Sequence, residues 1–219
     1  AAIVVDSRSA LAAIAFGFGI WLIAGSLIEL AQRLKLGAAP FADSVRRLRA
    51  TPRASLGMTI SHAALGLVVL GSVATSAWHD ELIRTVKTDE TMDFVGYQVT
   101  LQRVETVEGP NYVAERATLA VTRGGRLYTI LQPERRLFVV QRRQVAETAI
   151  QTNLLRDLYA TLGEGDAASG WVIRLYLNPL APWIWLGAAL CAFGGFVSLS
   201  DRRLRIGAPS RLRPATLSS

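Results

Sequence analysis

His62 is the residue of this sequence whose type and position point most directly to chemistry. It lies in the apolar stretch Leu56–Trp78, about six residues from the end that adjoins a basic segment, or ~9 Å along a helix. An imidazole at that depth in a bilayer is costly unless it faces protein, water, a partner or a metal. Neutral imidazole is a common haem-iron ligand, because one ring nitrogen binds iron while the other donates a hydrogen bond. His62 is therefore a candidate axial ligand.

The neighbours of His62 fit two interpretations. Five of them have small side chains: Gly57, Ser61, Ala63, Ala64 and Gly66. Small side chains admit a macrocycle, but they equally admit a second helix, to which His62 would then form a hydrogen bond. Because no other histidine lies within an apolar stretch, a second axial ligand would come from another chain or another segment.

Other residues that could react give weaker indications. His79 follows the second apolar stretch, where we expect it to be solvated, and Cys191 is expected to pack as a small apolar residue. The sequence contains no CxxCH, Walker A or HExxH motif, so no catalytic residue is assigned. The following charged residues favour a solvated surface with a few ion pairs over a functional network: Glu134, Arg135, Arg136, Glu147, Arg156, Asp157 and Glu164.

Three apolar stretches predict an integral membrane protein. Of the 219 residues, 51% are hydrophobic and 19% are charged, which excludes an intrinsically disordered chain. The stretches are Ala10–Leu30, Leu56–Trp78 and Pro182–Leu199, each close to the ~20 residues that cross a bilayer. Buried helices of a soluble protein are the alternative, but uncharged runs of this length are rare there.

Basic residues flank these stretches on one side. Residues 33–53 contain six Lys or Arg and one Asp, and residues 201–219 contain five Arg and one Asp. The positive-inside rule predicts that both segments are cytoplasmic and that residues 79–181 lie outside. The net charge of +7 then comes from the two basic segments that orient the chain in the membrane and lie beside anionic lipid. No nucleic-acid partner is expected.

Residues 79–181 predict a small extracytoplasmic domain that is rich in β-structure, either a barrel or a sandwich. Residues 116–122 alternate polar and apolar side chains, and Gly124-Gly125 joins them to the β-prone run 127–131, which is typical of a tight hairpin. Further strands are expected at 94–107 and 171–176, and a helix is expected around 145–162.

The predicted organisation follows from these segments. It comprises a first transmembrane helix with a short outer segment (1–32), a basic cytoplasmic loop (33–55), a second transmembrane helix (56–78), the periplasmic domain (79–181), a third transmembrane helix (182–200) and a basic cytoplasmic tail (201–219).

An ordered set of short motifs resembles the CcmF cytochrome c haem lyases. Residues 57–62 resemble the start of a helix in that family, G-M-x-x-(A/S)-H. Residues 109–112 match GPNY, residues 133–136 resemble (P/A)-E-(K/R)-R, and residues 156–164 match RDLYxxLGE. Residues 183–185, 194–195 and 201–202 match the final helix and its exit. Residues 145–147 depart from the family's MTE and read Val-Ala-Glu.

The resemblance implies a role in system I cytochrome c maturation. Such a protein receives haem from the haem chaperone CcmE and attaches it by thioether bonds to the CxxCH motif of apocytochrome c, whose thiols are handled by CcmH and CcmI. It also holds a haem b between two transmembrane histidines, the second of which corresponds to His62. The matching segment is the C-terminal part of the family, so the missing N-terminal part of the same protein, or a split subunit, is an expected partner. Lyase activity is expected only within that larger complex.

The resemblance also implies a location in the bacterial inner membrane with a periplasmic domain, or in the mitochondrial inner membrane for an organellar protein. Two other functions stay open. One is a non-catalytic assembly scaffold whose outer domain docks partners, and the other is a subunit of a haem transporter.

Overall fold

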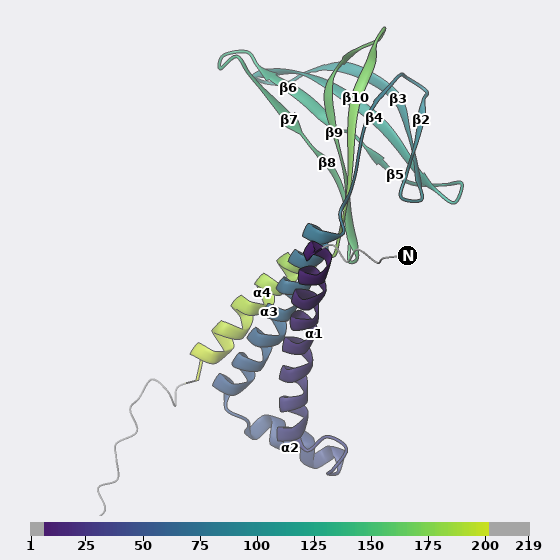
Figure 1. Ribbon diagram of the computed structural model, residues 1–219. Coiled ribbons are helices and arrows are strands. Elements are labelled where there is room, and N and C mark those ends of the chain that lie inside the picture. The colour runs from purple at the N-terminus through teal and green to yellow at the C-terminus, as the bar shows by residue number, and fades with distance from the viewer. Residues whose placement is uncertain (1–6, 202–219) are drawn as a thin grey trace, which may run out of the picture. The chain divides into compact units, whose positions relative to one another are not determined.

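The computed structural model describes residues 7–201 and contains four helices, of which three are long and apolar (Figure 1). These three are α1 (Ser7–Leu34), α3 (Arg53–Ala77) and α4 (Ala181–Leu199). Each contains a stretch long and apolar enough to cross a membrane. The prediction of three apolar helices is therefore confirmed. The predicted outer segment before residue 7 and the basic tail after Asp201 lie outside the described residues.

A fourth helix, α2 (Phe41–Ala50), lies in the segment that the sequence analysis treats as a loop. It follows Pro40, whose fixed φ suits the residue that precedes a first helical turn. Its only large apolar residues are Phe41, Val45 and Leu48, which recur at the i, i+4, i+7 spacing of one helix face.

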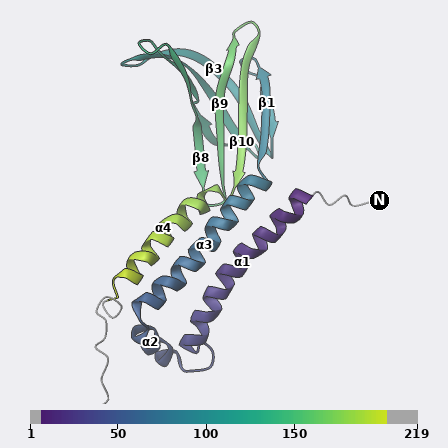
Figure 2. The same ribbon diagram turned by 60° about the vertical axis from the view of Figure 1, so that its left-hand side comes forward.

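The ten strands of the described residues lie between α3 and α4 in the chain and form two antiparallel sheets (Figures 1 and 2). The first sheet has the order β1 (Asp80–Val86), β10 (Gly170–Pro179), β9 (Arg156–Asp166) and β8 (Ala149–Asn153). The second has the order β2 (Thr91–Phe94), β3 (Tyr97–Glu108), β4 (Tyr112–Arg123), β6 (Glu134–Phe138) and β7 (Arg143–Glu147), with β5 (Arg126–Leu131) also paired to β4. The predicted β-rich domain is a sandwich.

The sandwich core follows the period of two along the longest strands. Inward residues are fully buried on β3 and β4 of one sheet and on β9 and β10 of the other: Val99, Leu101, Leu119, Val121, Leu158, Leu162, Ile173 and Leu175. On β4, Leu119 and Val121 point into this core, but Thr118 and Ala120 between them are also buried, at 3% and 9% exposure. The alternation at 116–122 therefore does not separate a core face from a solvent face, as the sequence predicted.

The predicted hairpin is confirmed at its turn. Gly124 and Gly125 have φ of 58° and 74°, and Arg123 pairs with Arg126 across them. Two consecutive residues with positive φ are what a type I′ turn needs, and glycine supplies both without strain.

The predicted helix at 145–162 is wrong, because these residues form β7, β8 and the first half of β9. The reversal between β8 and β9 is held by Asn153, whose Oδ1 accepts hydrogen bonds from the backbone N–H of Leu155 (2.8 Å) and Arg156 (3.0 Å). An asparagine that fixes a turn in this way breaks the segment into two strands.

We predict that a polypeptide of residues 77–179 folds alone and that its stability depends on the shared core. Leu119→Ala should lower the free energy of unfolding by about 2–5 kcal/mol, because it leaves a cavity at a fully buried position. Leu127→Ala is the matched control, since Leu127 is 63% exposed, and should cost less than ~0.5 kcal/mol. Urea unfolding followed by circular dichroism measures both. A helical spectrum, or equal losses in the two variants, would contradict the assigned fold.

Candidate functional site

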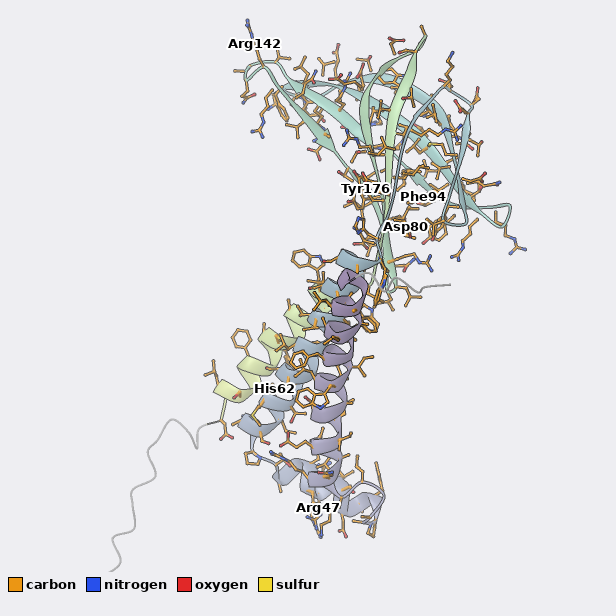
Figure 3. All side chains as sticks on the ribbon, in the orientation of Figure 1. Arg47, His62, Asp80, Phe94, Arg142 and Tyr176 are labelled. Atoms are coloured by element: carbon orange, nitrogen blue, oxygen red, sulfur yellow. The ribbon has the colours of Figure 1, made fainter. Side chains whose placement is uncertain are left out.

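His62 lies on the surface of α3 with an exposed side chain (Figure 3). Its Nδ1 is 2.8 Å from the backbone carbonyl oxygen of Met58, one turn earlier in the helix. A carbonyl oxygen can only accept, so this contact requires that Nδ1 carries the proton and donates. In the neutral ring, Nε2 is then left with its lone pair.

This arrangement suits a metal ligand. In metal sites, the histidine nitrogen that does not bind metal usually donates to a carbonyl or carboxylate, which fixes the tautomer and the ring orientation. Here the helix backbone supplies that acceptor, and Nε2 is the nitrogen that could bind iron. The donor set therefore fits one axial position of a haem.

A hollow of about 250 Å³ lies beside His62, between α3 and α1. Two other residues of α3 line it, together with five residues of α1: Met58, Thr59, Trp21, Leu22, Gly25, Ser26 and Glu29. The α1 residues could not be found from the sequence, because the pairing of two apolar helices leaves no local signal in either. Among them, Gly25 borders open space, since a Cβ there would meet nothing within 4 Å.

Most of the small residues near His62 serve helix contacts. A Cβ on Gly57 would collide with the backbone of Gly194 and Ser198 of α4, and a Cβ on Gly66 would collide with the backbone of Gly19 of α1. The helices therefore pack against α3 at these positions, and Gly57 and Gly66 provide no room for a macrocycle. The expectation that these two glycines leave room for a macrocycle is therefore wrong. The open space beside His62 is the hollow on the α1 side.

The other candidate residues show no sign of a site. Cys191 is half buried and its thiol donates to the backbone oxygen of Ser61 at 3.4 Å, while the Ser61 hydroxyl donates to the oxygen of Cys191 at 3.3 Å. Cys191 is thus a packing residue between α3 and α4, and His79 is exposed between α3 and β1. Within residues 7–201, no group of three or more His, Cys, Asp or Glu side chains could hold a metal ion.

In the sandwich, several of the charged residues form an ion-pair cluster across β4, β6 and β7. Glu134 is only 6% exposed and binds Arg116 (Nε to Oε1, 2.6 Å) and Arg136 (Nε to Oε2, 2.8 Å). Arg136 also donates to Glu147 at 3.1 Å. Burial raises the pKa of Glu134, but hydrogen bonds from the two guanidinium groups outweigh it and hold the pKa below its ordinary value.

The cluster is more connected than the sequence analysis expects, yet it covers only part of the predicted set. Arg135 pairs instead with Glu115 (2.6 Å). The remaining three residues, Arg156, Asp157 and Glu164, belong to β9 and have no ion pair within the described part of the chain. These contacts hold strands together, and none of them exposes a reactive group.

A second hollow, of about 460 Å³, lies on the sandwich between β7 and the strands β9 and β10. Tyr159 and Tyr176 line it with their rings stacked at 4.6 Å, and Arg135 and Arg174 line it as well. A hydrogen bond with Glu81, together with burial, raises the pKa of Tyr176 above its ordinary value. The hollow offers aromatic and cationic contacts to a partner.

Comparison with known families identifies the sandwich. Residues 77–179 match the family model described as the CcmF C-terminal β-sandwich. A solved structure titled cytochrome c haem lyase CcmF aligns with a TM-score of 0.69 at 18% identity, over 86% of this chain and 30% of that one. At this identity, the structural match establishes a shared fold.

Curated relatives extend the match beyond the sandwich. The chain is 38% identical over 213 residues to the cytochrome c-type biogenesis protein CycK of Bradyrhizobium diazoefficiens, covering 94% of this chain and 32% of the relative. It is 39% identical over 209 residues to the cytochrome c-type biogenesis protein ccl1 of Rhodobacter capsulatus, covering 95% and 31%. The cytochrome c-type biogenesis protein CcmF of Escherichia coli is 30% identical over 187 residues. The chain spans about a third of the length of these curated relatives.

We predict that Glu134 stabilises the sandwich at neutral pH. The pKa of Glu134 is lower in the folded chain than in the unfolded chain. Its contribution to the free energy of unfolding is therefore complete above its pKa in the unfolded chain, and it is lost as the pH falls through its pKa in the folded chain. Glu134→Gln should cost about 1–3 kcal/mol at pH 7, because Arg116 loses its ion-pair partner among the described residues and Arg136 keeps only Glu147. It should also flatten the acid side of the stability profile. The control is Glu105→Gln, whose pair with Arg103 is long (3.4 Å) and exposed and should contribute less than ~1 kcal/mol. Unfolding of residues 77–179 between pH 3 and pH 7 tests this, and identical profiles for the two variants would refute it.

Proposed function

The chain belongs to the CcmF family and matches its C-terminal portion, and on this basis we propose that it forms the C-terminal part of a cytochrome c haem lyase. In this role it works in a complex that receives haem from a haem chaperone of the CcmE type. The complex joins the haem by thioether bonds to the CxxCH motif of apocytochrome c, with CcmH and CcmI as the thiol-handling partners. The remaining two thirds of the relatives' length, on the same polypeptide or on a separate subunit, would supply the rest of the site.

Within this complex, we assign His62 as one axial ligand of a transmembrane haem b. The observation that carries this proposal is the hydrogen bond from Nδ1 to the Met58 carbonyl, which leaves Nε2 available beside an open hollow. A haem in this position would supply one-electron redox chemistry. The part played by this chain is to hold the imidazole as a single tautomer and to surround it with apolar helix.

We also propose that the three apolar helices cross the inner membrane, with α2 in the cytoplasm and the sandwich in the periplasm. Support comes from the six Lys and Arg residues between positions 33 and 53, which the positive-inside rule assigns to the cytoplasmic side. Thioether formation needs haem and reduced thiols together outside the cytoplasm, which agrees with a periplasmic sandwich.

A scaffold that docks partners without binding haem is the alternative. The hollow beside Tyr159 and Tyr176 favours it, because stacked tyrosine rings beside an arginine such as Arg174 suit contact with another protein. The two functions differ in whether the helices of this chain hold haem.

We predict that His62→Ala lowers the b-type haem content of the complete complex by about tenfold or more, because one axial bond is lost. His62→Met should retain some haem with an altered spectrum, since a thioether also binds iron. His79→Ala is the control, because this exposed histidine lies between α3 and β1, and should leave haem content unchanged. A pyridine haemochrome assay with a redox titration measures these effects. Wild-type haem content and potential in His62→Ala would reject the ligand assignment.

We predict that Val140, which is 85% exposed at the tip between β6 and β7, faces the periplasm. In a Cys191→Ser background, Val140→Cys should react with a membrane-impermeant maleimide applied to spheroplasts, whereas Arg47→Cys on α2 should react only after lysis. The reverse pattern would show that the chain is inserted with the opposite orientation.

A further inference from the structure

Helix α2 is amphipathic, and its apolar face is largely uncovered. Phe41 is 80% exposed and Leu48 is 40% exposed, and Val45 lies between them on the same face. The opposite side of the helix carries Arg46 and Arg47. Two large apolar side chains are thus exposed on one face of a ten-residue helix.

The positive charge of this region is largely without anionic partners. Arg46 pairs with Asp43 at 2.9 Å. Arg47, Arg49 and Arg53 form no ion pair with any residue in the range 7–201. Three guanidinium groups that have no ion pair among the described residues therefore lie within seven positions of the chain.

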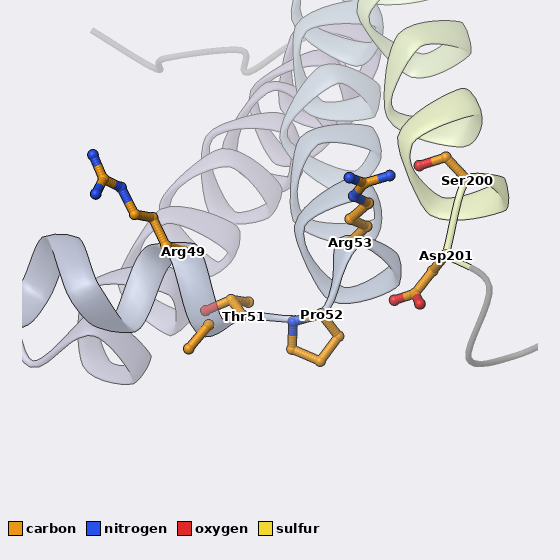
Figure 4. A pocket seen from close by; sticks show the side chains of 7 residues that line it. Arg49, Thr51, Pro52, Arg53, Ser200 and Asp201 are labelled. Carbon is orange, nitrogen blue, oxygen red and sulfur yellow. The ribbon is translucent and has the colours of Figure 1, made fainter.

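Two of these arginines border a polar hollow of about 540 Å³ where α2 meets the start of α3 (Figure 4). Arg49 and Arg53 line it with Thr51, Pro52, Ser200 and Asp201. The Asp201 carboxylate accepts a hydrogen bond from the backbone N–H of Ala54 at 3.1 Å, so it is engaged at the helix start. Figure 4 shows the Arg53 and Asp201 side chains pointing in opposite directions.

The chain leaves α2 little freedom to move away from the apolar helices. Only Thr51 and Pro52 separate α2 from α3, and residues 35–40 separate it from α1. Two residues extend at most ~7 Å. If α1 and α3 cross the membrane, as proposed above, α2 lies at the level of the lipid headgroups.

From these observations we propose that α2 is an interfacial helix that binds anionic phospholipid of the cytoplasmic leaflet. Phe41, Val45 and Leu48 insert among the upper acyl chains, and Arg47, Arg49 and Arg53 bind phosphodiester groups, with the hollow at the start of α3 holding one headgroup. Apolar burial and charge complementarity act together here, as in other surface-binding amphipathic helices. This inference rests on the membrane-spanning part of the proposed function and is independent of haem binding.

Fluorescence quenching tests the insertion of the apolar face. The whole chain, in a Cys191→Ser background, carries bimane at Phe41→Cys or at Ala50→Cys in nanodiscs that contain phosphatidylcholine and phosphatidylglycerol. Position 50 is the matched control, because nine residues place it about half a turn away from Phe41 around the helix. Ala50 lines the hollow proposed to hold a headgroup, so a label there lies at headgroup level and not among the acyl chains that carry the doxyl group. Doxyl-labelled phospholipid should quench the label at position 41 at least about threefold more strongly than the label at position 50.

A third label separates failure of this proposal from failure of the spanning model. Phe196 is 73% exposed on α4, so Phe196→Cys should be quenched by lipid whenever the apolar helices are in the bilayer. Quenching at 196 with equal or no quenching at 41 and 50 would overturn the interfacial helix alone. Absence of quenching at 196 would overturn the membrane-spanning helices and this inference with them.

Lipid retention tests the charged part. The double variant Arg49→Gln, Arg53→Gln should retain about fivefold less phosphatidylglycerol on purification than the unaltered chain, with phosphatidylcholine unchanged, as native mass spectrometry would measure. Arg126→Gln, at an exposed arginine that begins β5, is the control and should retain the original amount. Equal phosphatidylglycerol retention by the double variant would refute the headgroup contact.

Discussion

Close contact between α3 and its neighbours determines the arrangement of the described helices. Three glycines of α3 face other helices so closely that a Cβ would collide: Gly57 with α4, Gly66 with α1, and Gly71 with Leu180 and Ile184 at the start of α4. In lipid, apolar side chains gain little by moving from lipid to protein, so helices associate through such close packing. His62 is four residues before Gly66 and so lies on the face of α3 that meets α1. The contact that joins these two helices thus also positions the imidazole beside the hollow.

The apolar helices could be predicted from the sequence because their signal is one of length and composition. The hairpin at Gly124-Gly125 could be predicted because the turn has a strict backbone requirement, which only a few residue pairs meet. Both features are local. Neither depends on knowing which segment packs against which.

Features that depend on partners were mispredicted. Leu154, Leu155, Leu158 and Leu162 have a spacing that a helix would accept, yet Leu154 and Leu155 are exposed in the turn that Asn153 holds, and the other two point into the core. Because β9 pairs with β10 and β8, this segment is a strand, with a side-chain period of two, and not a helix, with a period of 3.6. The local sequence does not show this pairing. For the same reason His62 could be proposed as a ligand from its depth alone, whereas Gly25 on α1 could not be associated with it.

The register of β1 with β10 gives the sandwich a property of its own. Asp80 pairs with Leu177, so the first and last strands of a domain of about a hundred residues begin and end side by side. A flexible connection of that length between α3 and α4 would oppose their association through the entropy of loop closure, which grows with the logarithm of loop length. Once β1 and β10 pair, the effective connection shrinks to a few residues at each end. The folded sandwich therefore connects α3 to α4 as a short linker would. Insertions in turns between its inner strands would lengthen the chain without moving the end of α3 away from the start of α4.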